Sequence, residues 1–137
     1  MPVLETDFLK GLLDPKDRLH DSSKRALGKV QRGEWNLASS SLLELDLLLK
    51  HAGMEPEERT TIFETLSAEI PKETILGLAH STMSTAALVQ SRHKDAKRFY
   101  FDSLHLAVAL ESDGKIVSTD RYFDQVRGIE RMPLERV

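Results

Sequence analysis

The sequence predicts an α/β fold, a three-layer sandwich in which helices cover both faces of a mostly parallel, five-stranded sheet. Short stretches with extended spacing of apolar residues alternate along the chain with longer stretches of helical spacing. This alternation is typical of parallel sheets, because parallel strands are joined by crossover helices. No linker, repeat or low-complexity tract interrupts residues 1–137, so we expect one domain.

The N-terminal part of the chain is predicted to form one strand followed by two helices. Val3-Leu4 is a short apolar strand, after which residues 8–13 change to helical spacing. Asp14-Pro15 marks a turn. Asp21-Ser22 is expected to cap a second helix, which Gly33 stops.

The next segment predicts a strand followed by two more helices. Residues 35–39 form the strand, and Ser41 and Glu44 have the spacing of a capping box at the head of an apolar helix that ends near Gly53. A further helix begins at Pro56, because proline is favoured at the first helical position, and runs to residue 68.

The last part of the chain completes the sheet. Residues 69–74 contain a proline and charges, which suit an edge strand better than a central one. Helices are expected at 75–90 and 101–112. Strands at 115–118 and 129–132 follow.

Composition excludes several classes of protein. Hydrophobic residues make up 40% and charged residues 30%, enough to fill a core, and cysteine is absent, which excludes disulfides, thiolate metal sites and a cysteine nucleophile. With no leader-like start and no run of 18 apolar residues, we expect a cytoplasmic protein that does not span a membrane.

Charge is unevenly distributed, although the net charge is only −3. Residues 16–32 hold six basic and two acidic side chains, a net charge of plus 4, and residues 92–98 hold four and one, a net charge of plus 3. Such runs are usually solvated helix faces and loops, but they also provide local patches that attract a nucleic-acid backbone.

Familiar catalytic and nucleotide-binding motifs are missing. There is no His-Glu-x-x-His, no Gly-x-Gly, no Gly-Lys-Ser/Thr and no Gly-x-Ser-x-Gly. These absences disfavour a zinc hydrolase, dinucleotide or P-loop binding and a serine hydrolase. The carboxylates remain as the candidates for chemistry.

Acidic residues recur where strands end or helices begin. Glu5 and Asp7 follow the first strand, Asp120 follows the strand at 115–118, and Glu44 and Asp102 stand in the first turns of helices. Because ligands of open parallel sheets bind outside the carboxyl ends of the strands, these acids are expected to converge. Like charges in one cluster recruit a hard cation such as Mg²⁺ or Mn²⁺, which indicates phosphodiester hydrolysis.

Each of these acids also has an ordinary structural interpretation. Glu44 suits a capping-box partner, Asp102 a helix N-cap, and Asp120 a turn residue. Asp124, four residues beyond Asp120 and on the same helical face, is a further candidate metal ligand. His105 is expected to pack or cap within its own helix.

The order and surroundings of the acids resemble the PIN domain, a family of metal-dependent ribonucleases that includes the VapC-like toxins of prokaryotic toxin–antitoxin pairs. The resemblance spans nearly the whole chain. Residues 100–107 (YFDSLHLA) are similar to the third acidic motif of the family, 116–123 (IVSTDRYF) to the fourth, and 39–45 (SSSLLEL) to the second.

The first motif departs from the family pattern. PIN domains usually present an Asp after the apolar strand, then a small hydroxyl residue and Ser or Asn, whereas this chain has Val3-Leu4-Glu5-Thr6-Asp7. Glu5 therefore takes the position of the usual Asp. Residues 5 and 7 share one side of an extended strand, so Asp7 is an alternative source of that carboxylate.

The resemblance implies a ligand set and partners. Asp102, Asp120 and Glu44, with Glu5 or Asp7, would bind one or two divalent ions and cleave the RNA backbone by hydrolysis, while Thr119 and Ser41 would support the ligands. It also implies a homodimer and a possible antitoxin protein. Side chains expected to guide the phosphate chain are Arg92, Lys94, Lys97 and Arg98.

The first interpretation is an endoribonuclease, which is either a toxin or a stand-alone RNA-processing enzyme. Two further interpretations remain beside it. One is a catalytically weakened PIN-like module that binds RNA or protein without hydrolysis, because Glu5 alters the metal site. The other is a structure-specific DNA nuclease, which the short chain disfavours because it leaves little room for a duplex clamp.

Overall fold

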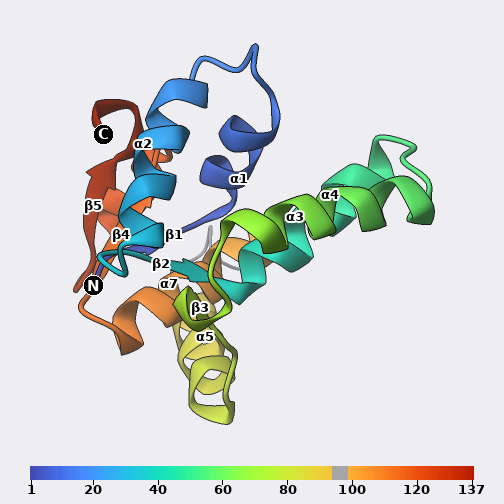
Figure 1. Ribbon diagram of the computed structural model, residues 1–137. Coiled ribbons are helices and arrows are strands. Elements are labelled where there is room, and N and C mark those ends of the chain that lie inside the picture. The colour runs from blue at the N-terminus through green and yellow to red at the C-terminus, as the bar shows by residue number, and fades with distance from the viewer. Residues whose placement is uncertain (94–98) are drawn as a thin grey trace.

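The computed structural model describes residues 1–93 and 99–137. Within them, five strands form one sheet in the order β3-β2-β1-β4-β5, and every neighbouring pair is parallel (Figure 1). This confirms the predicted fold class. The strands are β1 (Val3–Leu4), β2 (Asn36–Ala38), β3 (Ile75–Leu76), β4 (Lys115–Ser118) and β5 (Glu130–Pro133).

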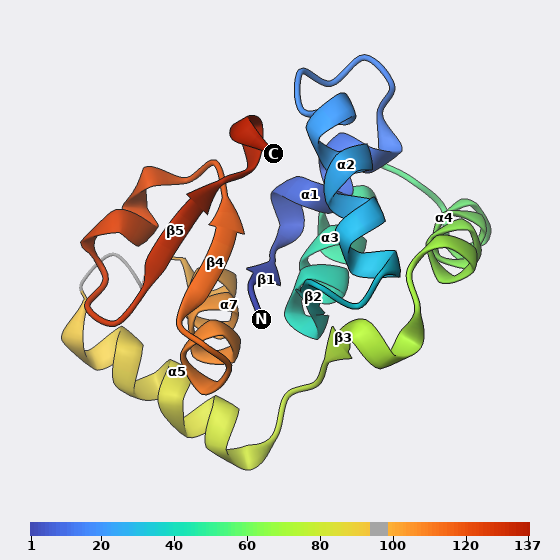
Figure 2. The ribbon, with the colours of Figure 1, turned by 60° about the vertical axis from the view of Figure 1, so that its left-hand side comes forward.

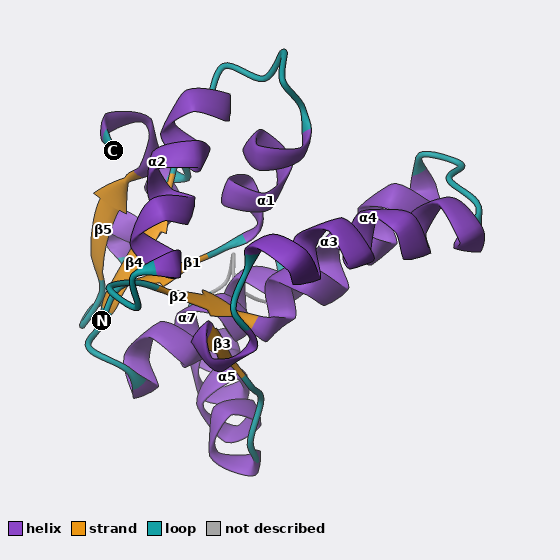
Figure 3. Cartoon of the chain, viewed as in Figure 1, coloured by secondary structure: helices purple, strands orange, loops and turns teal. Residues whose placement is uncertain are grey.

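Helices make up most of the rest of the described chain (Figure 3). None of them is long and apolar enough to cross a membrane. The α-helices are α1 (Thr6–Leu13), α2 (His20–Gln31), α3 (Ser39–His51), α4 (Pro56–Glu69), α5 (His80–Arg92) and α7 (Tyr100–Glu111). Short 3₁₀ helices are η1 (Lys72–Thr74), η2 (Arg121–Gln125) and η3 (Leu134–Arg136).

Alternation along the strands divides the core into two layers. In β1, Leu4 packs with Phe8 of α1, whereas Val3 packs with Leu106 of α7 on the opposite face. Successive side chains of a strand point to opposite faces, so two adjacent apolar residues serve both cores. Helices α1 and α2 therefore lie on one side of the sheet and α5 and α7 on the other (Figure 2).

The strand order creates a switch point between β1 and β4. The chain passes from β1 outward to β2 and β3, then returns through α5 and α7 to β4 on the other side of β1. Because crossovers between parallel strands are right-handed, reversing the direction of travel sends the connecting helices to the opposite face. The carboxyl ends of β1 and β4 consequently flank the crevice in which such sheets bind ligands.

The third strand was predicted at the wrong residues, but its position at the edge of the sheet was predicted correctly. Residues 69–74 are the end of α4 and the helix η1, and the strand is the following pair, Ile75–Leu76, which lies at the edge as expected. These residues pair with Leu37 and Ala38 of β2. The helix expected from residue 75 therefore begins only at His80.

The capping box predicted at Ser41 and Glu44 does not form. Helix α3 begins at Ser39, directly after β2, and its N-cap residue Ala38 offers no side-chain hydrogen bond. Glu44 thus lies in the second turn, where its side chain is available for contacts with other elements. The Ser41 hydroxyl is buried and has no hydrogen-bond partner among the described residues.

Close packing of α1 against α2 depends on Gly11. A Cβ atom at this position would collide with the Ser23 hydroxyl and lie 3.0 Å from Cβ of Leu19. The Gly11 carbonyl also accepts a hydrogen bond from Nδ1 of His20 at 2.9 Å. Glycine therefore lets the two helices approach closely enough to fix the segment that joins them.

We predict that Gly11→Ala lowers the free energy of unfolding by about 1–3 kcal/mol, because the added methyl group overpacks a buried contact. Thermal or urea unfolding of the metal-free protein measures the change. Gly28→Ala is the matched control. Its Cβ would meet only the flexible end of Arg32, at 3.3 Å, and alanine is worth up to about 1 kcal/mol more than glycine inside a helix. Equal stability of the two variants would contradict the packing argument.

Candidate metal centre

Acidic side chains from four elements gather beside the switch point. Glu5 directly follows β1, and Thr119 and Asp120 follow β4. Helix α3 contributes Glu44, and helix α7 contributes Asp102. Strand ends separated by more than one hundred residues in sequence are thus neighbours, because β1 pairs with β4.

Glu5 is a buried carboxyl group with one oxygen unsatisfied. The side chain is 5% exposed, and Oε2 accepts a hydrogen bond from the amide of Asp7 at 3.1 Å as the N-cap of α1. Oε1 has no hydrogen-bond partner among the described residues. Burial, followed by the charge of Asp7, raises the pKa of Glu5 well above its usual value, although the hydroxyl of Ser118 opposes the rise. A bound proton or a cation would relieve this cost.

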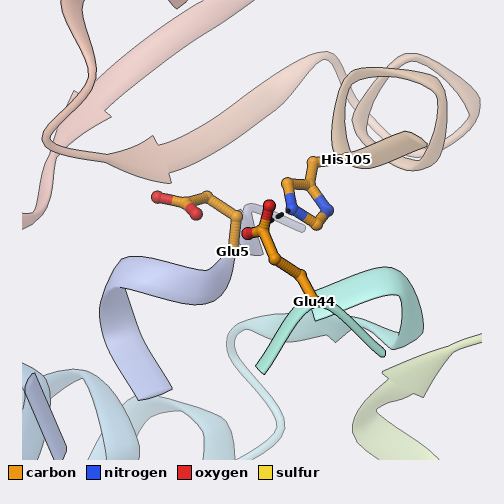
Figure 4. A group of neighbouring side chains, drawn as sticks. All are labelled: Glu5, Glu44 and His105. Atoms are coloured by element: carbon orange, nitrogen blue, oxygen red, sulfur yellow. Dashed lines mark hydrogen bonds and ion pairs between the residues drawn. The ribbon is translucent and has the colours of Figure 1, made fainter. Parts of the chain in front are cut away.

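His105 of α7 connects Glu44 of α3 (Figure 4) to Thr6 at the start of α1. Its ring is completely buried, with Nε2 3.4 Å from Oε1 of Glu44 and 3.3 Å from the hydroxyl of Thr6. Nδ1 lies 2.7 Å from the hydroxyl of Ser40. The neutral tautomer that satisfies these contacts has its proton on Nε2 and directs it toward Glu44, while Ser40 donates to Nδ1.

Glu44 is ionised by these contacts. Burial raises its pKa, but hydrogen bonds from His105 and Thr6, with the nearby charge of Lys10, outweigh burial and leave the pKa of Glu44 below its usual value. A carboxylate held in its charged form and in a fixed orientation is prepared to bind a cation.

Glu5, Glu44 and His105 together have the geometry of a cation site. One ligand atom from each lies within 4.8 Å of the others, and Figure 4 shows the carboxyl group of Glu44 between the ring of His105 and the carboxyl group of Glu5. The unsatisfied oxygen of Glu5 adds an independent reason for a positive ligand here. These residues therefore fit a divalent ion. For Nε2 of His105 to bind it, the ring proton would have to move to Nδ1.

Asp102 is electrostatically linked to the other acids. Burial, together with the charges of Glu44, Asp120 and Asp7, raises the pKa of Asp102 to about 6, while His105 opposes the rise. It is not an N-cap, because α7 begins two residues earlier at Tyr100. The acids predicted from the sequence thus act on one another across α3, α7 and both strand ends.

Asp7 lies between the metal site and a neighbouring cation. Its Oδ2 accepts a hydrogen bond from the hydroxyl of Thr119 and lies 3.4 Å from the amide of that residue. Its Oδ1 is 3.9 Å from the ammonium group of Lys10. Thr119 therefore orients Asp7, in agreement with the supporting role expected of it.

Asp120 and Asp124 have other contacts. Asp120 is the N-cap of η2 and accepts a hydrogen bond from the amide of Tyr122 at 2.8 Å, which matches its structural interpretation. Both carboxylate oxygens of Asp124 accept hydrogen bonds from Arg131, at 2.9 and 3.1 Å. The structure thus brings Asp120 toward the acidic group and engages Asp124 in a surface ion pair.

His105 is the site residue that sequence reasoning missed. It was expected to pack or cap within its helix, yet it contacts residues of α1 and α3. The available signal was its spacing of three residues from Asp102, which puts both side chains on one face of a helix.

The predicted phosphate-guiding residues are only partly described. Arg92 ends α5 and lines a pocket with Arg127 that contains none of the candidate metal ligands. Lys94, Lys97 and Arg98 lie outside the described residues.

Comparisons with known proteins give similarity at the level of structure. No family model and no curated protein sequence matches the chain. One similar solved structure is VapBC2 from Rickettsia felis bound to a DNA fragment from their promoter, with a TM-score of 0.68, 12% identity and coverage of 96% of this chain and 98% of that one. Another is FitAB bound to an IR36 DNA fragment, with a TM-score of 0.72, 12% identity and coverage of 100% and 97%. The chain therefore has a PIN-like fold, as the acidic motifs of its sequence predicted.

Proposed function

We propose that this protein is a metal-dependent endoribonuclease that hydrolyses RNA phosphodiester bonds. The observation that carries the proposal is the grouping of a carboxylate oxygen of the buried Glu5 within 4.8 Å of Glu44 and His105, with Oε1 of Glu5 unpartnered among the described residues and Asp102 electrostatically coupled to the same group. Carboxylates gathered at the switch point of a parallel sheet suit a hard divalent cation. The PIN-like fold agrees with this chemistry.

We assign Glu5 and Glu44 as ligands of the ion because they offer oxygens within 4.8 Å of each other, and Asp102 as the third because its charge interacts with that of Glu44. Asp7 and Asp120 lie at the edge of the site. Mg²⁺ or Mn²⁺ bound there would supply a Lewis acid that activates water and neutralises the phosphate. His105 is a positioning residue, because its Nε2 proton holds Glu44 in place. Thr119 does the same for Asp7 through its hydroxyl group.

The biological setting we propose is the toxin of a toxin–antitoxin pair, acting in the cytoplasm. The support is the likeness to VapBC2 in fold together with the VapC-like acidic motifs of the sequence. An antitoxin protein is then the expected partner, and a homodimer the expected assembly. Copurification tests for the antitoxin protein, and analytical sedimentation tests for the homodimer.

We predict that Asp102→Asn and Asp120→Asn each reduce Mn²⁺-dependent cleavage of single-stranded RNA at least 100-fold, because each variant removes a negative charge from the cation site. A fluorescent RNA substrate with Mn²⁺, and with EDTA as the blank, measures this loss. Asp21→Asn is the matched control, since Asp21 is an exposed residue of α2 outside the acidic group.

The same variants separate loss of chemistry from loss of folding. Metal-free Asp102→Asn should be more stable than the wild type at pH 7, by about 1–2 kcal/mol after allowance for partial exposure, because the fold opposes ionisation of Asp102. This gain should fade as pH falls below about 6 and vanish below about pH 3, where the carboxyl group is neutral in both folded and unfolded chains. Full cleavage by both variants would defeat the assignment, and absence of any Mn²⁺ effect on the wild type would favour the binding module.

We predict that Mn²⁺ affinity falls as pH decreases below about 6. Asp102 then carries a proton in the metal-free protein, and the ion must displace that proton to bind. The apparent Kd should rise about tenfold per pH unit for each proton displaced. Calorimetry at pH 5, 6 and 7 in buffers of different ionisation enthalpy measures both affinity and proton release. A Kd that does not change over this range would contradict the ligand role of Asp102.

We predict that Glu5→Gln weakens Mn²⁺ binding more than Asp7→Asn does. Glu5 has a buried oxygen without a partner, whereas the carboxylate of Asp7 is already hydrogen-bonded by Thr119. The expected difference is about tenfold in Kd, measured by calorimetry at pH 7. The reverse order would assign the first carboxylate to Asp7.

A further inference from the structure

A polar groove opens directly beside the proposed metal centre. Its volume is about 580 Å³, and two of its lining residues, Asp7 and Thr119, belong to the acidic group already described. The remaining lining residues come from α1 and the loop that joins it to α2: Lys10, Asp17, Arg18 and Leu19. A ligand in this groove would therefore extend from the metal centre toward two cations.

Lys10 stands at the junction of the groove and the acidic group. Its side chain is 53% exposed, and its ammonium group lies 3.9 Å from Asp7, too far for a hydrogen bond. The charge of Lys10 also lowers the pKa of Glu44, which identifies it as a neighbour of both carboxylates. A loose surface pair of this kind contributes little to stability, so the ammonium group is available to a stronger anion.

Arg18 supplies a second cation on the same groove. The side chain is exposed, and its guanidinium group has no hydrogen bond or ion pair with any described residue. The backbone around it is nevertheless fixed. The amide of Leu19 donates to Asp17 at 2.8 Å, and Nδ1 of His20 donates to the carbonyl of Gly11 at 2.9 Å. Arg18 is thus presented at a defined position.

Two acids, Asp7 and Asp17, also line the groove, so its charged side chains balance and the binding of an anion depends on which N–H donors are available. Asp17 accepts a hydrogen bond from the amide of Leu19, and Asp7 accepts one from the hydroxyl of Thr119. One oxygen of each carboxylate is engaged in this way, whereas Lys10 has only its long contact with Asp7 and Arg18 has no partner among the described residues, so both cations have donors left over. A ligand entering the groove therefore meets unsatisfied N–H groups, which favour anionic oxygen atoms.

We propose that Lys10 and Arg18 bind the backbone phosphates of the RNA strand next to the phosphate that is cut, so that the strand leaves the metal centre along this groove. The inference rests on the proposed ribonuclease function. An RNA strand fits because it carries a phosphate at every nucleotide, one for the metal centre and the next for the cations. Both residues are positioning residues, since they orient the strand without entering the reaction.

The test compares Lys10→Gln/Arg18→Gln with Lys24→Gln. Lys24 is an exposed residue of the same basic run that does not line the groove. Two measurements are made with a single-stranded RNA of ten nucleotides: the kcat and KM of cleavage with Mn²⁺, and the Kd in EDTA by fluorescence anisotropy at several salt concentrations. Thermal unfolding verifies that the exposed substitutions leave the fold intact.

The double variant should raise KM and Kd about tenfold while kcat changes less than twofold. The slope of log Kd against log salt should fall by about 1.4, the value for two single-strand phosphates. Lys24→Gln should change neither. If the wild type cleaves RNA but the double variant behaves like Lys24→Gln, the groove assignment is wrong and the ribonuclease proposal stands.

The reverse outcome is equally distinct. If the wild type never cleaves RNA, yet the double variant weakens binding in EDTA as described, the groove stands and the ribonuclease proposal fails. If the double variant retains its affinity for RNA but loses affinity for a poly-glutamate peptide, the groove belongs to an acidic peptide and our assignment is overturned.

Discussion

The burial of negative charge at the switch point between β1 and β4 is the constraint on which the rest of the site depends. Glu5 is 5% exposed and has an oxygen with no partner among the described residues. Asp102 is held with a raised pKa by burial and by three neighbouring carboxylates. A fold tolerates such a cluster only if protons or a cation neutralise it, so the cluster couples folding, pH and metal binding.

Neutral groups surround this cluster and control its geometry. His105 is completely buried. Its ring contacts Thr6 at the start of α1, and Ser40 and Glu44 in α3, the helix that follows β2. A ring with both nitrogens engaged has one orientation, and a fixed ring fixes the carboxylate that it contacts. Helix α3 therefore cannot shift along its axis without disturbing the proposed ligands.

Much of the fold could be predicted from local patterns. Alternating apolar segments predicted a parallel sheet with helices on both faces, and four of the five strands were found close to their actual positions. The third strand was misplaced because the helices α4 and η1 extend to Thr74, so the strand begins later than the proline and charges of residues 69–74 indicated. The capping-box prediction for Glu44 failed for a similar reason: α3 follows β2 without a loop, so the first turn lies earlier than the local pattern indicated.

Residue types at strand ends and the spacing of apolar residues are local properties, so they were enough to identify the available acids and the fold that holds them. How those acids are used depends on the folded arrangement. Asp124 pairs with Arg131, Glu5 is buried with a free oxygen, and His105 reaches two other helices. These roles depend on contacts between segments up to a hundred residues apart, and such contacts exist only after β1 and β4 have paired.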